Sequence, residues 1–188
     1  MIVAAAVGLA LLIQAFVVKP FQIPSGSMKP TLEINQRVLA NRVNYRFTEP
    51  GIGDVVIFRP PMGVQRGGRC GVRREPGQAC PRATPEAATE SPPFIKRIVA
   101  GPGDTLSVRN GHPVVNEVEA EEDFVNPCGG GAACDLPEEI VIPPGEYFMM
   151  GDNRGASEDS RFWGPVPRER IIGQALLTYW PPDRIGPL

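Results

Sequence analysis

The hydrophobic pattern begins with a continuous apolar run at the start of the chain. Met1 to Val18 is nearly all Ala, Val, Leu and Ile, interrupted only by Gly8 and Gln14. A helix of this length spans about 27 Å, close to the hydrocarbon thickness of a bilayer. A cleaved signal peptide is the competing interpretation, but no Lys or Arg precedes the run, and no A-x-A site with polar residues after it ends the run. The pattern therefore predicts one N-terminal transmembrane helix over residues 1–18.

Beyond this run, short apolar segments alternate with polar turns. A run with Asn110-Gly111 at its centre has apolar residues alternating on both sides, which is typical of a β-hairpin. The segments predicted as strands or hairpins cover residues 37–45, 54–59, 94–100, 105–115, 146–150 and 171–180. Many short strands joined by turns predict an all-β domain over residues 19–188.

Two stretches lack this periodicity. Residues 60–93 are rich in Gly, Pro, Arg and Ala, and we expect them to form a flexible, exposed insertion that is largely unstructured outside its cysteine pair. Residues 117–139 are acidic and are expected to form a loop. Pro and Gly, with 22 and 21 residues, are abundant throughout, which favours turns over long helices.

Charge and cysteine spacing narrow the class of protein. A formal net charge of −2 gives no basic face, so nucleic acid is not an expected partner. The four cysteines form two close pairs without CxxC spacing, and the single histidine adjoins neither, so no metal site is expected. We interpret Cys70–Cys80 and Cys128–Cys134 as disulfides of a domain in an oxidising compartment. Four free thiols in a cytosolic protein are the alternative.

A candidate nucleophile lies just past the apolar run. The segment from Pro20 to Leu32 carries two serines, Ser25 and Ser27, within Pro-Ser-Gly-Ser-Met-Lys-Pro. Because proline fixes φ and glycine relaxes it, this segment predicts a sharp turn at the end of an extended piece. Such a turn can present one hydroxyl on a rigid backbone.

A serine nucleophile needs a base, and the chain offers few. His112, the only histidine, adjoins Asn-Gly at a hairpin tip, where a solvated turn residue is expected. Of the three lysines, Lys19 lies at the membrane boundary, where snorkelling accounts for it, and Lys29 follows the serine turn and is expected to be solvated.

Lys96 is different because of its strand neighbours. Alternation places its side chain on the same face as Phe94 and Ile98, which would surround the amine with apolar surface. Desolvation lowers the pKa of a lysine, and only the neutral amine can accept a proton from serine. Lys96 is therefore the predicted base.

A polar run over residues 151–164 is too sharply punctuated to be a core element. It carries paired charges and hydroxyls that could orient a buried amine by hydrogen bonding. These are Asp152, Arg154, Asp159, Arg161, Ser157 and Ser160.

Three motifs in this order resemble those of bacterial type I signal peptidases, and Asp54-Val-Val-Ile-Phe is similar to a fourth. The motifs are Pro24-Ser-Gly-Ser-Met-Lys-Pro-Thr-Leu32, Phe94-Ile-Lys-Arg-Ile-Val-Ala-Gly-Pro-Gly-Asp104 and Gly151-Asp-Asn-Arg-Gly-Ala-Ser-Glu-Asp-Ser-Arg-Phe-Trp-Gly164. The resemblance covers most of the chain outside residues 60–93 and the acidic loop. It implies a mainly antiparallel β-ribbon catalytic domain behind a single membrane anchor, on the extracytoplasmic side of the cell membrane.

The resemblance also implies roles for individual residues. Ser27 would be the nucleophile and Lys96 the general base, with the Ser25 hydroxyl and the Ser27 backbone N–H forming the oxyanion hole. Ser157 would orient Lys96 by a hydrogen bond. Asp159 and Arg161 would form a structural ion pair, and Asp152 and Arg154 would support the same loop. Cys128 and Cys134 lie where some relatives carry a loop disulfide.

The implied substrates are pre-proteins bearing signal peptides, cleaved after small-x-small sites through an acyl-enzyme. The substrate would bind as an added strand. Residues expected to bind it are Phe21, Gln22, Ile23, Pro24, Leu32, Phe94 and Ile95. The lipid bilayer is the other expected partner, no cofactor is implied, and we expect a monomer.

Three alternatives are weaker. Self-cleaving repressors resemble this fold and dyad, but a DNA-binding helical module is absent and an apolar run stands in its place. A β-lactam-recognising Ser-x-x-Lys site fails because Ser27 and Lys29 are separated by only one residue. A catalytically inactive peptide-binding domain would not need Ser27 or Lys96.

Overall fold

A computed structural model of the chain describes residues 18–61, 70–84, 92–130 and 133–188. Residues 1–17 of the predicted transmembrane helix lie outside the described residues, and its last predicted residue, Val18, begins a strand instead. Among those that are described, no helix combines the length and apolar character needed to cross a membrane. The prediction of an all-β domain is confirmed, since its strands form two antiparallel sheets and its helices are single turns.

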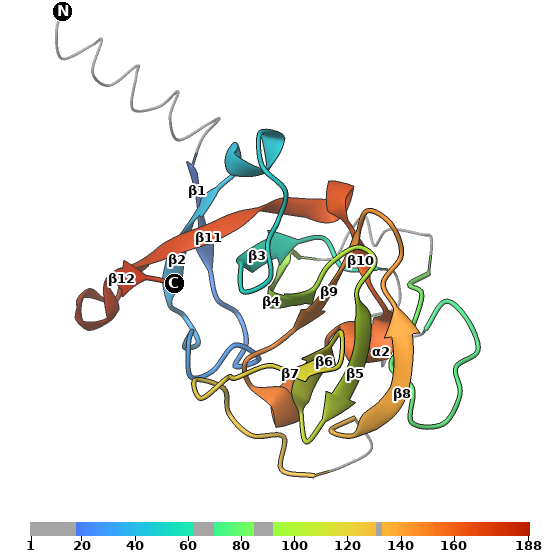
Figure 1. The fold of residues 1–188 in the computed structure, drawn as a ribbon. Coiled ribbons are helices and arrows are strands. Elements are labelled where there is room, and N and C mark those ends of the chain that lie inside the picture. The colour runs from blue at the N-terminus through green and yellow to red at the C-terminus, as the bar shows by residue number, and fades with distance from the viewer. Residues whose placement is uncertain (1–17, 62–69, 85–91, 131–132) are drawn as a thin grey trace, which may run out of the picture.

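The larger sheet has eight strands in the order β1-β2-β11-β3-β4-β9-β10, with β12 paired to β11 (Figure 1). Every pairing in it is antiparallel. Its strands are β1 (Val18–Gln22), β2 (Arg37–Asn41), β3 (Val55–Phe58), β4 (Phe94–Ala100), β9 (Glu146–Met150), β10 (Val166–Pro167), β11 (Ile171–Trp180) and β12 (Gly186–Pro187).

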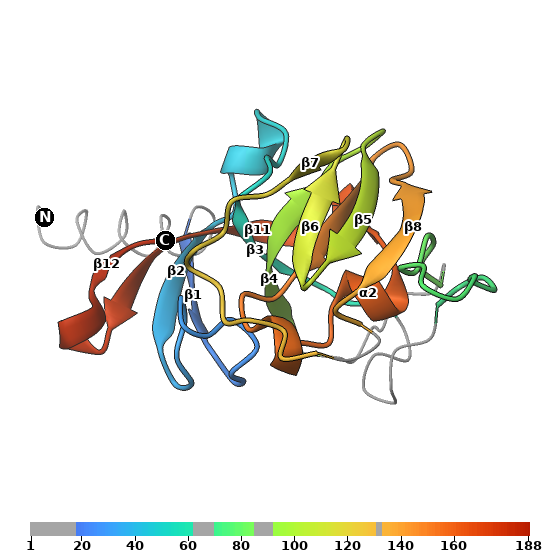
Figure 2. The same cartoon turned by 60° about the horizontal axis from the view of Figure 1, so that its bottom comes forward.

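The smaller sheet has the order β7-β6-β5-β8 and lies at the opposite end of the molecule from β1 and β2 (Figure 2). The predicted hairpin is present, with Asn110 and Gly111 both at positive φ, as its turn requires. Its strands are β5 (Thr105–Arg109), β6 (His112–Val115), β7 (Val118–Glu119) and β8 (Leu136–Val141). Short helices are η1 (Asn44–Arg46), η3 (Arg154–Ala156), α2 (Ser160–Trp163), η4 (Arg168–Arg170) and η5 (Pro182–Arg184).

Two predictions about secondary structure are wrong in part. The strand predicted over residues 37–45 ends at Asn41, whose side chain accepts hydrogen bonds from the backbone N–H groups of Val43 and Asn44. Such side-chain bonds stop a strand and start a turn, here the helix η1. The acidic stretch expected as a loop contains β7 and part of β8, whose only buried residues, Leu136 and Ile140, are four apart rather than two.

The described part of the insertion, residues 70–84, is tied to the domain. Ala79 and Cys80 are fully buried, the Cys80 N–H donates to the Arg161 carbonyl, and Glu138 N–H donates to the Gly77 carbonyl. The Sγ atoms of Cys70 and Cys80 lie 2.09 Å apart, and those of Cys128 and Cys134 lie 2.07 Å apart, both at disulfide distance. The end of this segment, at Ala79 and Cys80, is therefore packed against the domain, whereas residues 71–76 are exposed, as expected.

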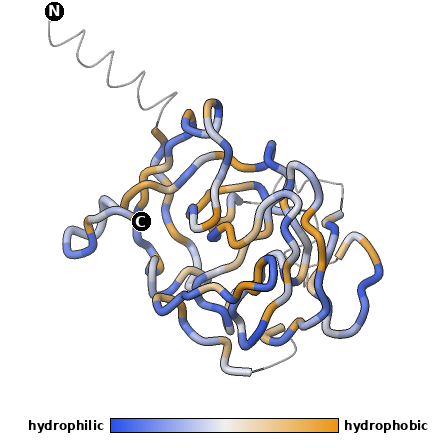
Figure 3. Tube along the Cα trace, viewed as in Figure 1, coloured by the Kyte–Doolittle hydropathy of each residue, from blue (hydrophilic) through white to orange (hydrophobic). Residues whose placement is uncertain are grey.

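Apolar side chains pack on both faces of β4. Ile95 joins a cluster with Val55, Ile57 and Ile23, whereas Ile98 joins a second cluster with Trp163 and other residues of β3, β9 and β10. In Figure 3 the apolar segments accordingly follow the strands of the interior, and polar colours follow the outer loops. Strand β4 thus packs Ile95 into one cluster and Ile98 into the other, and Val99 and Ala100 join a third.

Candidate active site

Ser27 lies in a tight turn that follows β1 and is anchored in the core. Met28 and Leu32 are both fully buried, and the Leu32 N–H donates to the Met28 carbonyl at 2.9 Å. The Lys29 N–H donates to the Gly26 carbonyl, which closes the turn. Burial of the residues on the far side of the turn holds Ser27 at the surface of a cavity, with 9% of its area exposed.

Lys96 reaches Ser27 from the middle of β4. Its Nζ atom donates a hydrogen bond to Ser27 Oγ at 2.5 Å, and only 3% of the residue is exposed. As the alternation predicts, Phe94 and Ile98 lie in the apolar cluster on this face, and Nζ is 5.8 Å from the centre of the Phe94 ring. Lys96 lies 69 residues after Ser27 in sequence and is held in the middle of the sheet, where it opposes Val56 of β3.

This burial changes the protonation of Lys96. Desolvation lowers the pKa of the amine from 10.5 to about 8, although Asp159 and Asp152 act in the opposite direction. At neutral pH about a tenth of the amine is then neutral, compared with about one part in three thousand for an ordinary lysine. The amine can therefore accept a proton from Ser27 without an external base.

Two donors lie beside the Ser27 hydroxyl. Ser25 Oγ is 3.3 Å from Ser27 Oγ, within hydrogen-bonding reach. Among the described residues, no backbone carbonyl accepts from the Ser27 N–H. A hydroxyl and a backbone N–H next to a nucleophile are the groups from which an oxyanion hole is built.

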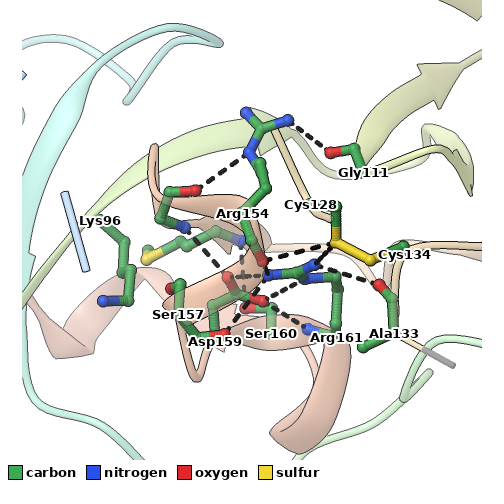
Figure 4. A network of polar contacts seen from close by, with 12 residues as sticks. Lys96, Gly111, Cys128, Ala133, Cys134, Arg154, Ser157, Asp159, Ser160 and Arg161 are labelled. Atoms are coloured by element: carbon green, nitrogen blue, oxygen red, sulfur yellow. Dashed lines mark hydrogen bonds and ion pairs between the residues drawn. A yellow bond between two sulfur atoms is a disulfide. The ribbon is translucent and has the colours of Figure 1, made fainter. Parts of the chain in front are cut away.

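The loop after β9 supports this arrangement through a buried ion pair. Arg161 Nε and one terminal nitrogen donate to the two Asp159 oxygens at 2.8 and 2.9 Å, and both residues are almost fully buried. Burial alone would raise the pKa of Asp159, but the adjacent Arg161 guanidinium and the Gly151 N–H hold that pKa below its usual value. Asp159 is thus an anion that fixes the start of the loop (Figure 4).

Asp152 and Arg154 pair with residues outside the polar run. Arg97, next to Lys96 on β4, donates twice to Asp152, which also accepts from Thr31 Oγ1 at 2.5 Å. Asp152 therefore connects the strand of Lys96 to the turn of Ser27.

Arg154 makes a two-pronged ion pair with Glu122 at 2.6 and 2.7 Å, and it also donates to the carbonyls of Gly151 and Gly111. Pairing within the run, which the sequence suggested, is limited to Asp159 and Arg161.

Asn153 is a supporting residue that sequence reasoning missed. Its side-chain amide donates to the Gly26 carbonyl and its backbone N–H donates to the Ser27 carbonyl, both at 3.0 Å. These two bonds hold the serine turn against the loop after β9. The available signal was its place in Gly-Asp-Asn-Arg, but one loop amide has no periodicity that points to a partner more than a hundred residues away.

Ser157 does not make the predicted hydrogen bond to Lys96. In Figure 4 its side chain lies between Lys96 and the Asp159–Arg161 pair, without a bond to either. Its buried Oγ has no hydrogen-bond partner among the described residues. A methyl group built on Gly151 would lie 2.2 Å from this oxygen and 2.4 Å from the Ser27 carbonyl, so only glycine leaves room there.

The cavity at Ser27 has a volume of about 420 Å³ and is mostly apolar. It includes Pro24, Phe94 and Ile95 of the predicted substrate-binding set. A small adjoining pocket contains Phe21, Gln22 and Ile23. The prediction that Leu32 binds the substrate is wrong, because Leu32 is fully buried in the core and lines neither space.

The remaining candidate bases lie away from the dyad. Lys29 forms an exposed ion pair with Glu33 at 2.8 Å, and Lys19 lies over the Phe21 ring. His112 Nδ1 is 3.5 Å from Glu122 at the hairpin turn. None of these three lines the cavity at Ser27.

Comparison with known proteins identifies the family. Residues 1–180 match the family described as "Signal peptidase, peptidase S26". The chain is 38% identical to "Probable thylakoidal processing peptidase 2, chloroplastic" of Arabidopsis thaliana, covering 96% of this chain and 43% of that one. It is also 38% identical to "Probable signal peptidase I-1" of Synechocystis sp., over 96% of this chain and 80% of that relative.

A signal peptidase I from Enterococcus faecalis V583 of known crystal structure is 21% identical, with a TM-score of 0.41 over 68% of this chain and 97% of that one. The chain spans less than half the length of the two thylakoidal peptidases it matches, 43% and 47%. With the family match extending over nearly the whole sequence, the chain belongs to the signal peptidase family, peptidase S26.

Proposed function

We propose that this chain is a membrane-bound serine endopeptidase that removes N-terminal signal peptides from exported pre-proteins. The observation that carries the proposal is the 2.5 Å contact between Lys96 Nζ and Ser27 Oγ at the wall of a cavity. A desolvated lysine in contact with a serine hydroxyl is the arrangement that activates a serine without histidine. Family membership agrees with this chemistry.

In the proposed reaction Lys96 is the general base. The neutral amine accepts the Ser27 proton while Oγ attacks the scissile carbonyl, and the protonated amine then returns that proton to the leaving amine. The acyl-enzyme is hydrolysed in the same way, with water replacing Ser27 as proton donor and the Ser27 hydroxyl restored at the end. No metal or cofactor takes part in the scheme.

Ser25 and the Ser27 backbone would stabilise the tetrahedral intermediates. The Ser25 hydroxyl is 3.3 Å from Ser27 Oγ and can turn its proton to an oxyanion formed there. Asn153, which holds the Gly26 and Ser27 carbonyls, would keep this donor pair in place.

The substrate would lie extended along the cavity between the Ser27 turn and the start of β4. Phe94, Ile95 and Pro24 give this cavity apolar walls, and the adjoining pocket behind Phe21 and Ile23 has room for little more than a small side chain, at about 20 Å³. A wall of this kind favours small apolar residues before the cut, as in Ala-x-Ala sites.

We also propose that residues 1–17 anchor the chain as a single-pass helix, with the residues from Val18 onward forming an extracytoplasmic peptidase domain that carries the insertion at 60–93. Two cysteine pairs at disulfide distance support an oxidising compartment. Every group in the scheme comes from one chain, so the enzyme would act as a monomer.

The test is cleavage of a pre-protein with an Ala-x-Ala site by the full chain in a nonionic detergent. Wild type and Lys29→Ala should cleave, whereas Ser27→Ala and Lys96→Met should be inactive with unchanged circular dichroism. Cleavage by Lys96→Met together with loss in Lys29→Ala would refute the assignment of the base. A folded but inert wild type would favour a peptide-binding domain instead.

A further inference from the structure

A second cavity lies beside the start of β1, and its lining is strongly basic. Its volume is about 430 Å³, within the range of small-molecule sites. The residues are contributed by β1, by the segment around η1, by the end of β3 and by η4. We call it the cationic cavity, after its six basic residues Lys19, Arg42, Arg46, Arg59, Arg168 and Arg170.

The charge of this cavity is opposite to that of the whole protein. Six cations and one carboxylate, Glu169, give a lining charge of +5, whereas the chain as a whole carries −2. Like charges gathered in one concave surface repel one another and raise the local concentration of anions. Of the 21 acidic residues in the chain, Glu169 lines the cavity, and Glu49, which does not line it, forms an ion pair with Arg168.

The backbone fixes the cations in place. The Arg59 N–H donates to the Arg170 carbonyl at 3.0 Å, which joins the end of β3 to η4. Arg168 forms an ion pair with Glu49 and donates to the carbonyls of Tyr45 and Thr48, which fastens the η1 segment over the same cavity. The cavity is therefore built by ordered contacts between distant segments.

Three of the cations are available to a ligand. Lys19, Arg46 and Arg59 are exposed, and none of them forms an ion pair with another described residue. A guanidinium presents parallel N–H donors that match two oxygens of a phosphate, and an ammonium adds a point charge. The lining thus fits a phosphate group better than a single carboxylate.

The position of the cavity suggests where such a phosphate comes from. Lys19 lies in β1 and directly follows the apolar run that ends at Val18. Basic side chains next to a membrane-spanning segment are placed at the depth of lipid headgroups, where anionic lipids attract them.

We propose that the cationic cavity binds a phosphate-bearing anion, carried by an anionic lipid headgroup or present as free phosphate. This site is separate from the cavity at Ser27, and its test does not depend on peptidase activity. Arg46 and Arg59 have exposed side chains and form no ion pair with another described residue. They would therefore contribute most of the binding affinity for the anion.

The test measures binding of short-chain dihexanoyl-phosphatidylglycerol to the full chain in a nonionic detergent, by calorimetry. The double variant Arg46→Gln/Arg59→Gln should bind about 30-fold more weakly than wild type, as expected for two basic residues facing an anionic lipid. The matched control, Arg37→Gln/Arg73→Gln, removes two exposed charges outside the cavity and should bind like wild type.

Inorganic phosphate and dihexanoyl-phosphatidylcholine distinguish the possible sources. Binding of inorganic phosphate with the same dependence on Arg46 and Arg59 identifies free phosphate as the ligand; binding of phosphatidylglycerol alone identifies a lipid headgroup. Raising salt to about 0.5 M should weaken wild-type binding, because exposed charges are screened. Equal affinity of the two double variants, or equal affinity for phosphatidylcholine and phosphatidylglycerol, would overturn the proposal.

Discussion

Replacing Lys96 by methionine should abolish cleavage and at the same time stabilise the folded protein near neutral pH. Methionine keeps the length of the side chain and removes an amine that is 3% exposed and surrounded by apolar residues. Because burial lowers the Lys96 pKa to about 8, the folded state holds the proton less tightly than the unfolded state does. The protonated amine is therefore a destabilising group.

The gain in stability can be calculated from the change in the pKa of Lys96. The pKa falls from 10.5 to about 8, a difference of 2.5, which corresponds to roughly 3 kcal/mol at 1.36 kcal/mol per pKa unit. Below pH 8 both states are protonated and the full penalty applies. Between pH 8 and 10.5 the folded state loses its proton first, so stability increases with pH and the penalty disappears.

The assay is chemical unfolding of wild type and Lys96→Met in the same detergent, at several pH values from about 7 to 10. In the difference between the two free energies of unfolding, the contributions of the other titrating groups cancel. The advantage of Lys96→Met should shrink by roughly 2.5 kcal/mol across this range. Wild-type kcat/KM should rise over the same range, with a midpoint near the Lys96 pKa of about 8. A stability difference that does not change with pH, or a flat activity profile, would refute a desolvated base.

Three further predictions concern the support of the dyad. Asn153→Ala should lower kcat by about fivefold with little change in KM, because it removes a bond of order 1 kcal/mol that holds the serine turn; an unchanged kcat would show that the backbone bond suffices. Gly151→Ala should inactivate the enzyme, since its methyl group would lie 2.4 Å from the Ser27 carbonyl, and full activity would exclude this packing. Asp159→Asn should destabilise the fold by about 3–5 kcal/mol in unfolding experiments by leaving Arg161 buried without its anion, and Arg161→Met in the same background should recover part of the loss.

Lys96 could be predicted as the base from sequence because strand alternation is a local rule, whereas the choice of Ser27 over Ser25 came from the family resemblance. Phe94 and Ile98 flank Lys96 at a spacing of two, so its burial follows from three neighbouring residues. The partners of Asp152 were not predictable in this way. Its contacts, Arg97 and Thr31, depend on how β4 and the serine turn meet after folding.

Strand β8 and Ser157 illustrate two other limits. Pro137 and the wide spacing of buried residues in β8 hide the alternation that identifies a strand. The hydrogen bond from Ser157 to Lys96 was carried over from a family resemblance, and a resemblance conveys residue types without the rotamer of a hydroxyl. The substrate-binding residues were likewise predicted from apolar residues near Ser27 and Lys96. Such a pattern does not distinguish residues that line a cavity from residues of the core behind it, and Leu32 belongs to the core.

The position of the insertion has a consequence for engineering the protein. Residues 60–93 connect β3 to β4, two strands whose register is already set by direct pairing from Val55–Arg97 to Phe58–Phe94. Chain length added between paired strands changes the entropy of loop closure only slowly and need not alter the distance between Lys96 and Ser27. Because Ala79 and Cys80 of this connection are packed against the domain, a reporter or binding module is best grafted outside residues 70–84, within residues 62–69 or 85–91, while the paired strands on either side keep the amine and the hydroxyl in contact.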